Sequence, residues 1–215
     1  MNPPSCLIIG CGHFGSRAVE TLLEKYPRSK IVIVDRHKKE FKKISQLPVE
    51  TKIGDGVTYL KQFLSESGKV DYIIPAVPFH LAFEFILSQL KPLGGKREKV
   101  PDITGLPNPM RGKEGNLYTS FADFICPEDC PEPARYCTVT REKREKPLYK
   151  ILEDLNGPYE SKVIRSQQLG LGVGGYSPEN LLKVVREIKK NGATDCLILI
   201  STACRCHAVI SALSF

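Results

Sequence analysis

Long apolar segments are missing from this sequence of 215 residues. No run approaches the ~20 consecutive apolar residues that a membrane-spanning helix requires, so direct insertion into a membrane is not expected. The first residues also lack the basic stretch, apolar core and cleavage site of a secretory signal. These absences predict a cytoplasmic protein with reduced thiols. Its eight cysteines are therefore expected to be metal ligands, reactive thiols or small core residues rather than disulfides.

A nucleic-acid-binding pattern is also missing. The net charge of +7 is spread over patches at 36–43, 91–99 and 141–150, and no basic stripe is interleaved with aromatic side chains. We interpret the patches as solvated surface, with attraction to an anionic cofactor as a secondary effect. No nucleic-acid partner is expected.

The segment from residue 6 to residue 35 organises the rest of the chain. It contains, in order, an apolar run at 6–9, Gly10, Gly12, Gly15, a helix-period stretch, an apolar run at 31–34 and Asp35. Strand, glycine turn, helix, strand and acid in this order predict a dinucleotide site. The alternative is a glycine turn in an ordinary β-α-β unit.

The three glycines have separate roles in such a site. Gly10 permits the tight turn out of the strand, Gly12 lets the backbone approach a pyrophosphate, and Gly15 lets the helix pack on the sheet. The helix N-terminus then presents unpaired N–H groups and a positive dipole end to the phosphates.

Asp35 indicates which dinucleotide is bound. A carboxylate at this distance from the glycines accepts hydrogen bonds from an adenosine ribose, and it repels a 2′-phosphate, which favours NAD over NADP. Arg36 follows at once and weakens that choice, because a cation here can hold a 2′-phosphate.

The β-α-β rhythm continues after Asp35. We expect a strand at 49–53, a helix at 57–64 and a buried strand at 70–77. The rhythm predicts an α/β fold with a Rossmann-type, doubly wound, mostly parallel sheet and right-handed crossovers.

Residues 6–80 resemble known NAD(P)-binding domains. Over 6–77 the chain is similar to the TrkA-N type found in potassium-transport regulators, on the basis of Gly10, Gly12, Gly15, Asp35, Gly54-Asp55 and Asp71. The stretch 71–80 is also similar to the saccharopine-dehydrogenase-like group, in which a proline-bearing turn follows the fourth strand. The resemblance implies NAD(H) or NADP(H) binding with Asp55 near the adenine, and leaves the activity open.

The dinucleotide is accordingly expected to lie along the glycine turn and the neighbouring strand ends. The cofactor-binding candidates are Gly10, Cys11, Gly12, His13, Phe14, Gly15, Asp35, Arg36, Asp55, Pro75 and Ala76. For Cys11, packing of a small residue is an alternative reading, and for His13 a polar role at the helix start.

The second half matches no family recognised from its motifs. It is predicted to form a helix at 78–90, a proline- and glycine-rich connection at 91–115, a strand within 117–125, a helix at 147–155, a strand at 162–169, a second glycine loop at 170–175, a helix capped by Ser177, a strand at 196–200 and a terminal apolar helix after His207. The expected divisions are a dinucleotide-binding domain at 1–100, a cysteine-bearing connection at 101–145 and a smaller C-terminal α/β unit at 146–215.

Six soft metal ligands occur in two groups in this half. They are Cys126, Cys130 and Cys137 in a proline-stiffened loop, and Cys204, Cys206 and His207 after a buried strand. Thiolate and imidazole ligands suit zinc, and all-thiolate sets suit zinc or an iron–sulfur cluster. The alternative is that the two groups lie apart, as an irregular loop and a buried turn.

Two histidines are catalytic candidates. His80 follows the fourth strand, where dehydrogenases place the nicotinamide, and His207 belongs to the second ligand group; either can exchange protons near neutral pH. We expect the glycine turn, the segment after 75, the second glycine loop and the segment 202–207 to line one shared cleft, because each follows a predicted strand.

Two classes of function fit these features. One is an NAD-dependent oxidoreductase with an unidentified small-molecule substrate and an additional metal site. The other is a non-catalytic NAD(H)-sensing regulator of the TrkA-N type with a small-molecule effector. A homodimer is expected in either case.

Overall fold

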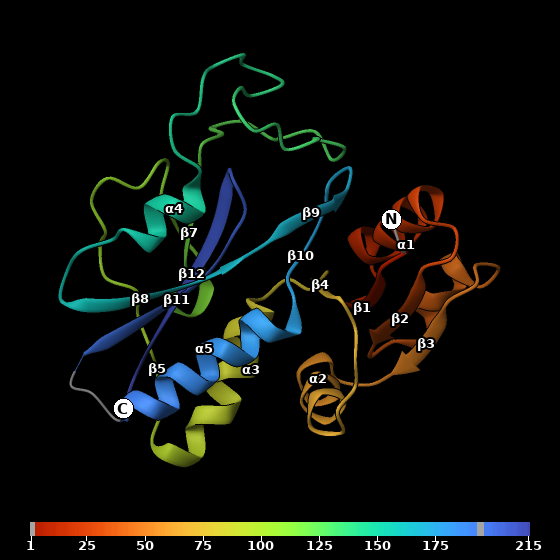
Figure 1. The fold of residues 1–215 in the computed structure, drawn as a ribbon, viewed down its shortest axis with the longest axis horizontal. Helices are drawn as coiled ribbons and strands as arrows, with labels where there is room; N and C mark the ends of the chain where they lie inside the picture. Colours follow the sequence, from red (N-terminus) through yellow and green to blue (C-terminus); the bar gives the residue numbers. More distant parts are fainter. Residues whose placement is uncertain (1–2, 193–195) are drawn as a thin grey trace.

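The computed structural model describes residues 3–192 and 196–215. Two main sheets lie side by side, with helices between them and a long loop above them (Figure 1). The predicted α/β fold is therefore confirmed.

The first sheet is parallel and has the strand order β3-β2-β1-β4. Its strands are β1 (Ser5–Ile9), β2 (Lys30–Asp35), β3 (Glu50–Ile53) and β4 (Tyr72–Pro75). Apolar β-branched residues fill the central strands: Ile8 of β1 pairs with Ile33 on one side and Ile74 on the other. All three are fully or nearly fully buried, as expected for strands covered on both faces.

Helices cover both faces of this sheet. Helix α1 (His13–Lys25) and the 3₁₀ segment η1 (Lys38–Ile44) pack on the face that carries Ile8 and Ile33. Helix α2 (Gly56–Ser65) and helix α3 (Leu81–Leu90) join the core on the opposite face. This arrangement confirms the doubly wound Rossmann-type architecture.

An antiparallel hairpin lies beside the edge of β4. It is formed by β9 (Gln167–Gly170) and β10 (Val173–Gly175), and its continuation pairs with β4 through two main-chain hydrogen bonds between Ile73 and Tyr176, of 2.8 and 3.0 Å. The second predicted glycine loop is thus the turn of this hairpin. It brings the second half of the chain against the first sheet.

The second sheet is mixed and has the order β6-β7-β12-β11-β8, with β5 also paired to β12. Its strands are β5 (Lys96–Glu98), β6 (Met110–Arg111), β7 (Leu117–Ser120), β8 (Tyr159–Arg165), β11 (Leu197–Ala203) and β12 (His207–Ser214). Two short 3₁₀ segments, η2 (Lys91–Leu93) and η3 (Lys113–Gly115), lie in the connection at 91–115.

The two sheets share a core. Helices α3 and α5 (Pro178–Asn191) lie between them, and one buried cluster contains Leu7 of the first sheet, Phe83 of α3 and Ile200 of the second sheet (Figure 1). Helix α4 (Leu148–Glu153) covers the other face of the second sheet. Ser177 caps α5 through a hydrogen bond from Asn180, as its position predicts.

One predicted element is wrong. Residues 207–214 form β12 rather than a terminal helix. A short run that is apolar on both faces fits a buried strand as well as a helix. Partners far away in sequence decide the matter, because β12 pairs with β5, β7 and β11.

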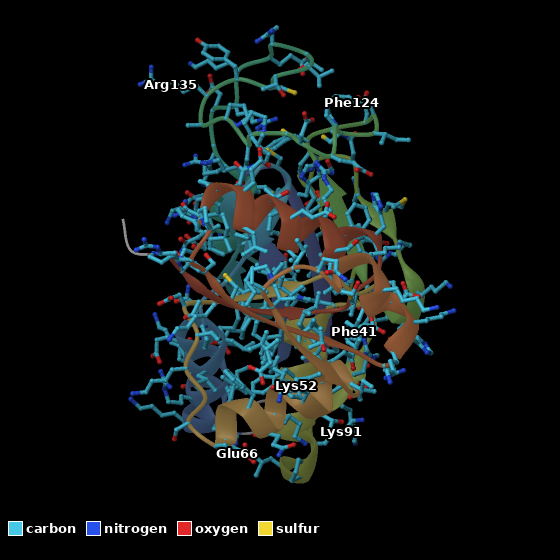
Figure 2. The ribbon with its side chains drawn as sticks, turned by 90° about the vertical axis from the view of Figure 1, so that its right-hand side faces the viewer. Phe41, Lys52, Glu66, Lys91, Phe124 and Arg135 are labelled. Carbon is cyan, nitrogen blue, oxygen red and sulfur yellow. The ribbon has the colours of Figure 1, made fainter. Side chains whose placement is uncertain are left out.

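The longest irregular stretch described runs from residue 121 to residue 147 and carries three of the cysteines. Figure 2 shows it at the top of the molecule, where Phe124 and Arg135 project from it, at the opposite end from Glu66 and Lys91. We call residues 126–137 the cysteine loop. No helix within 3–192 or 196–215 has both the length and the apolar character needed to cross a membrane.

Candidate functional site

The turn after β1 is fixed by two glycines that tolerate no side chain. Gly10 has a φ of +101°, and a Cβ added to it would lie 2.3 Å from the Ala76 carbonyl oxygen. A Cβ on Gly15 would lie 1.9 Å from the Gly10 carbonyl oxygen. The turn therefore packs against itself and against the segment that follows β4, which directs the first turn of α1 toward the ends of the strands.

Gly12 differs from these two glycines. It is the N-cap of α1, and a Cβ added to it would meet nothing within 4 Å. The space above the first unpaired N–H groups of the helix is therefore open. A phosphate fits such a position because it can accept from these N–H groups at the positive end of the helix dipole.

Asp35 is held at the end of β2. Its Oδ2 accepts from the Cys11 main-chain N–H at 2.7 Å, and its Oδ1 accepts from the His37 N–H at 2.8 Å. The carboxylate is thus fixed beside the glycine turn, where a ribose would use its remaining lone pairs. The Cys11 side chain is buried in the core, which agrees with the packing interpretation.

The cation beside Asp35 is already paired. Arg36 bonds Asp55, the N-cap of α2, and this contact together with the Thr58 N–H lowers the pKa of Asp55 to about 2. With Arg36 engaged by Asp55, its charge is partly neutralised at the position where a 2′-phosphate would need it.

Pro75 and Ala76 continue the row of strand ends. The Ala76 N–H donates to the Ile9 carbonyl at 2.8 Å, and both residues line a cavity of about 170 Å³ together with Phe14 of α1 and the hairpin turn at 172–174. The first turn of α1, through Phe14, and the β9–β10 turn thus face the same space.

His80 is buried, and both of its ring nitrogens are used. Nδ1 lies 2.8 Å from the Ser211 hydroxyl, which donates to Asn116, and Nε2 lies 2.8 Å from the Thr202 hydroxyl. Because the Ser211 hydroxyl donates its proton to Asn116, its oxygen can only accept from His80, so His80 donates from Nδ1 and accepts at Nε2. Burial, with a contribution from Arg97, lowers the pKa of His80 to about 3, so the ring is neutral at physiological pH.

The cavity next to His80 has a volume of about 290 Å³ and is lined by Pro75, His80 and Thr202, among other residues. It therefore adjoins the space beside Phe14 through Pro75. Both ring nitrogens of His80 are engaged there, and Nε2 accepts the hydrogen bond from the Thr202 hydroxyl.

The structure brings the two cysteine groups together. A cavity of about 380 Å³ is lined by Cys126, Cys130, Cys204, Cys206 and His207. Phe14 and the hairpin turn line it as well, so it adjoins the cavity beside Pro75 and Ala76. Cys137 faces an adjoining cavity of about 330 Å³, which also touches Cys126 and Cys206.

Neighbouring thiol, hydroxyl and main-chain groups lower the pKa of two of the thiols, Cys204 and Cys137. The N–H groups of Cys206 and His207 both lie 3.4 Å from the Cys204 sulfur. The Cys206 thiol and these contacts lower the pKa of Cys204, which in turn raises the pKa of His207. Hydrogen bonds of this kind favour a thiolate, the form that binds metals.

Cys137 repeats this arrangement. The Thr140 N–H, the Thr140 hydroxyl and the Val139 N–H lower the pKa of the Cys137 thiol to about 7. Within residues 3–192 and 196–215, however, no three cysteine, histidine or acidic side chains are gathered closely enough to hold a metal ion. Metal binding would have to draw the thiols inward from the cavity walls.

Several residues at this site have no signal in a single sequence. Thr202 and Ser211 fix His80 from strands more than a hundred residues away. Glu132 accepts from the Arg205 N–H beside Cys204, and its pKa is raised to about 7 by burial. Arg17 lies one helical turn after His13, and only this spacing indicates that it is close to the glycine turn.

Comparisons with known proteins divide the chain in the same way as the two sheets. The family model described as TrkA-N domain matches residues 6–73, so the first third is of the NAD-binding, Rossmann-like TrkA-N type, as its motifs indicate. A second family model, described as "Uncharacterized protein, C-terminal domain", matches residues 82–215. A protein of Archaeoglobus fulgidus described as an uncharacterized protein is 30% identical over 221 residues, covering 96% of this chain and 98% of that protein.

Proposed function

This chain belongs to the family described as "Uncharacterized protein, C-terminal domain", and we propose that it is an NAD(H)-dependent oxidoreductase. The dinucleotide part of the proposal starts from the TrkA-N segment, which precedes the residues that this family matches. The observation that carries the dinucleotide part is the open position above Gly12, next to the helix N-terminus and the fixed Asp35 carboxylate. Gly12 lets a diphosphate approach, and Asp35 accepts from the ribose.

The choice of NAD over NADP follows from the pairing of Arg36. Its guanidinium bonds Asp55, and the Asp35 carboxylate is fixed at the end of β2, one residue before Arg36. A 2′-phosphate would have to break this pair and lie near two carboxylates, so NADPH should bind more weakly than NADH.

The oxidoreductase part rests on the cavities beyond the dinucleotide turn. A bound nicotinamide would exchange hydride with a substrate near Pro75 and Ala76. In the adjoining cavity, Thr202 donates its hydroxyl proton to His80, so its oxygen can accept a hydrogen bond from a substrate hydroxyl. His207, which lines the thiol cavity, is the candidate for proton exchange with solvent.

The cysteines form the second part of the proposal. Cys126, Cys130 and Cys137 bind zinc or an iron–sulfur cluster, with a further ligand from Cys204, Cys206 or His207. Support comes from the shared cavity and from the two turns that stabilise thiolates at Cys137 and Cys204.

Calorimetric titration tests the dinucleotide part. NADH and NAD are expected to bind the wild type, NADPH more weakly, and Gly12→Val should abolish binding because the side chain fills the phosphate position. Absence of binding to any of the three ligands, or equal binding by Gly12→Val, contradicts the proposal.

Elemental analysis of protein purified without oxygen tests the metal part. About one zinc or a set of irons per chain is expected, and Cys126→Ser should lower the content. Metal-free protein whose melting temperature does not change with a chelator contradicts it.

A regulator of the TrkA-N type is the second candidate. One observation favours it: His80 is closed off by two hydroxyls, so the dinucleotide cleft lacks a free acid–base group at that position. In this case NADH binding would change the conformation of a homodimer without turnover. Light scattering and small-angle scattering with and without NADH, beside an assay for NADH oxidation with carbonyl compounds, separate the two functions.

A further inference from the structure

The cysteine loop places a carboxylate at the start of α1. Glu128 Oε2 lies 2.7 Å from Arg17 Nη1, and Glu128 Oε1 lies 3.1 Å from His13 Nε2. His13 and Arg17 belong to the first two turns of the helix that follows Gly12. The Glu128 carboxylate therefore occupies Arg17 and His13 beside the position where a diphosphate would bind.

Main-chain contacts hold this part of the loop in place. The Cys130 carbonyl accepts from the Gly172 N–H at 3.3 Å and from Gln168 Nε2 at 2.6 Å. Gly172 has a φ of +70°, and a Cβ added to it would lie 1.6 Å from the Glu128 carbonyl oxygen. Only glycine allows this approach, so the β9–β10 turn packs directly against the cysteine loop.

We propose that Glu128 competes with the diphosphate of the dinucleotide for Arg17 and His13. This inference rests on the proposed dinucleotide function and assigns regulation of that site to the cysteine loop. Glu128 stands between Cys126 and Cys130 in the sequence. Any state of these thiols that moves the loop, including metal binding, changes the position of the competing carboxylate and thereby the affinity for the dinucleotide.

The ion pairs of Glu128 contribute little to folding, which makes the contact testable. The Glu128 side chain is 53% exposed, and exposed pairs stabilise proteins weakly. Glu128→Gln removes the charge and keeps the shape, so the variant should fold. Asp129→Asn is the matched control, because it neutralises the exposed carboxylate next in the chain.

Titration with three ligands distinguishes competition at the phosphates from a general change. NADH and ADP-ribose both carry the diphosphate, whereas adenosine has none. Glu128→Gln should bind NADH and ADP-ribose about three- to tenfold more tightly than the wild type, and adenosine equally. Asp129→Asn should leave all three affinities close to those of the wild type.

A double-mutant cycle identifies the cation. Arg17→Gln should weaken NADH binding, and the gain from Glu128→Gln should shrink in the Arg17→Gln background, because the contested partner is gone. Unchanged or weaker NADH binding by Glu128→Gln, or an equal gain for adenosine, overturns the competition. If NADH binds neither wild type nor Glu128→Gln, the proposed dinucleotide function fails as well.

Discussion

The two sheets assemble their candidate sites in different ways. In the first sheet, the glycine turn and Asp35 are close in sequence, and parallel strands joined by a helix bring them together. At the second sheet, His80 at the start of α3 meets Thr202 of β11 and Ser211 of β12, which are 122 and 131 residues away in the chain. A site whose residues are close in sequence can be predicted from its motif. A site whose residues come from distant strands forms only when the whole sheet has assembled.

This difference in origin does not separate the two regions physically. One buried cluster runs from Leu7 and Ile9 of the first sheet through α3 and α5 to Ile198 and Ile200 of the second. The hairpin beside β4 adds a second link. We therefore expect the two sheets to unfold together.

Two matched core truncations test that expectation. Ile33 in β2 and Ile210 in β12 are both fully buried but belong to different clusters. Ile33→Ala and Ile210→Ala should each lower the free energy of unfolding by about 2–5 kcal/mol. Calorimetry and hydrogen exchange should show one transition in both variants. A separate early transition of the second sheet in Ile210→Ala, with NADH binding retained, would show that the regions are independent.

Acid should weaken the junction at His80. The unfolded chain takes up a proton near the ordinary histidine pKa of 6.5, whereas the folded pKa is about 3. The contribution is therefore fully present above pH 6.5 and is lost as the pH falls toward 3, by about 3 kcal/mol at pH 4.

The variant His80→Gln isolates this effect. Its stability is lower at pH 7, because Thr202 and Ser211 lose an ideal partner, but the difference from the wild type should shrink between pH 6.5 and 4. Urea unfolding at several pH values measures it. A difference that stays constant with pH contradicts the neutral, buried state of the ring.

Next to the first sheet, substitutions at two glycines should distinguish an effect on stability from an effect on NADH binding. Gly15→Ala should destabilise the protein by about 2–3 kcal/mol, since its Cβ would meet the Gly10 carbonyl. Gly12→Ala, facing open space, should change stability by less than about 1 kcal/mol and still weaken NADH binding. Thermal unfolding and calorimetric titration of both variants provide the comparison. Equal destabilisation by the two changes would contradict it.

The smallest expected effect concerns Asp55. Asp55→Asn keeps an N-cap for α2 but removes the charge paired with Arg36, and the partly exposed position limits the loss at pH 7 to about 1 kcal/mol. Because folding lowers the pKa of Asp55 to about 2, this contribution is present above pH 4 and disappears as the pH falls through 2. NADPH binding should improve relative to NADH in the variant, because Arg36 is released. Titration with both ligands checks this, and an unchanged ratio refutes it.

The same difference between the two sheets explains which elements and site residues could be predicted from the sequence. The strand, turn and helix of the first sheet follow from apolar periodicity and three glycines, and the structure has them at the predicted places. The capped start of α5 was equally readable, because Ser177 and Pro178 act within one helical turn. Signals that operate over a few residues can be read from one chain.

Distant contacts could not be read in this way. The segment 207–214 was predicted to be a helix, since its own pattern fits either state, and the three strands that pair with it lie elsewhere in the chain. The same limit applies to the competing carboxylate of Glu128, whose partners are 111 and 115 residues away. The density of soft ligands indicated a common metal site for the two thiol groups, with separate positions as the alternative, and no pattern specified the turns around Cys137 and Cys204.

The placement of β12 has a consequence for biosynthesis. This strand is the last in chain order, yet it lies inside the second sheet and pairs with β5, β7 and β11. On the ribosome, β1 to β4 can find one another early, whereas β5 and one edge of β7 remain unpaired until β12 has emerged. During that interval their unpaired edges are exposed, so the nascent second half is the part of the chain most in need of a chaperone.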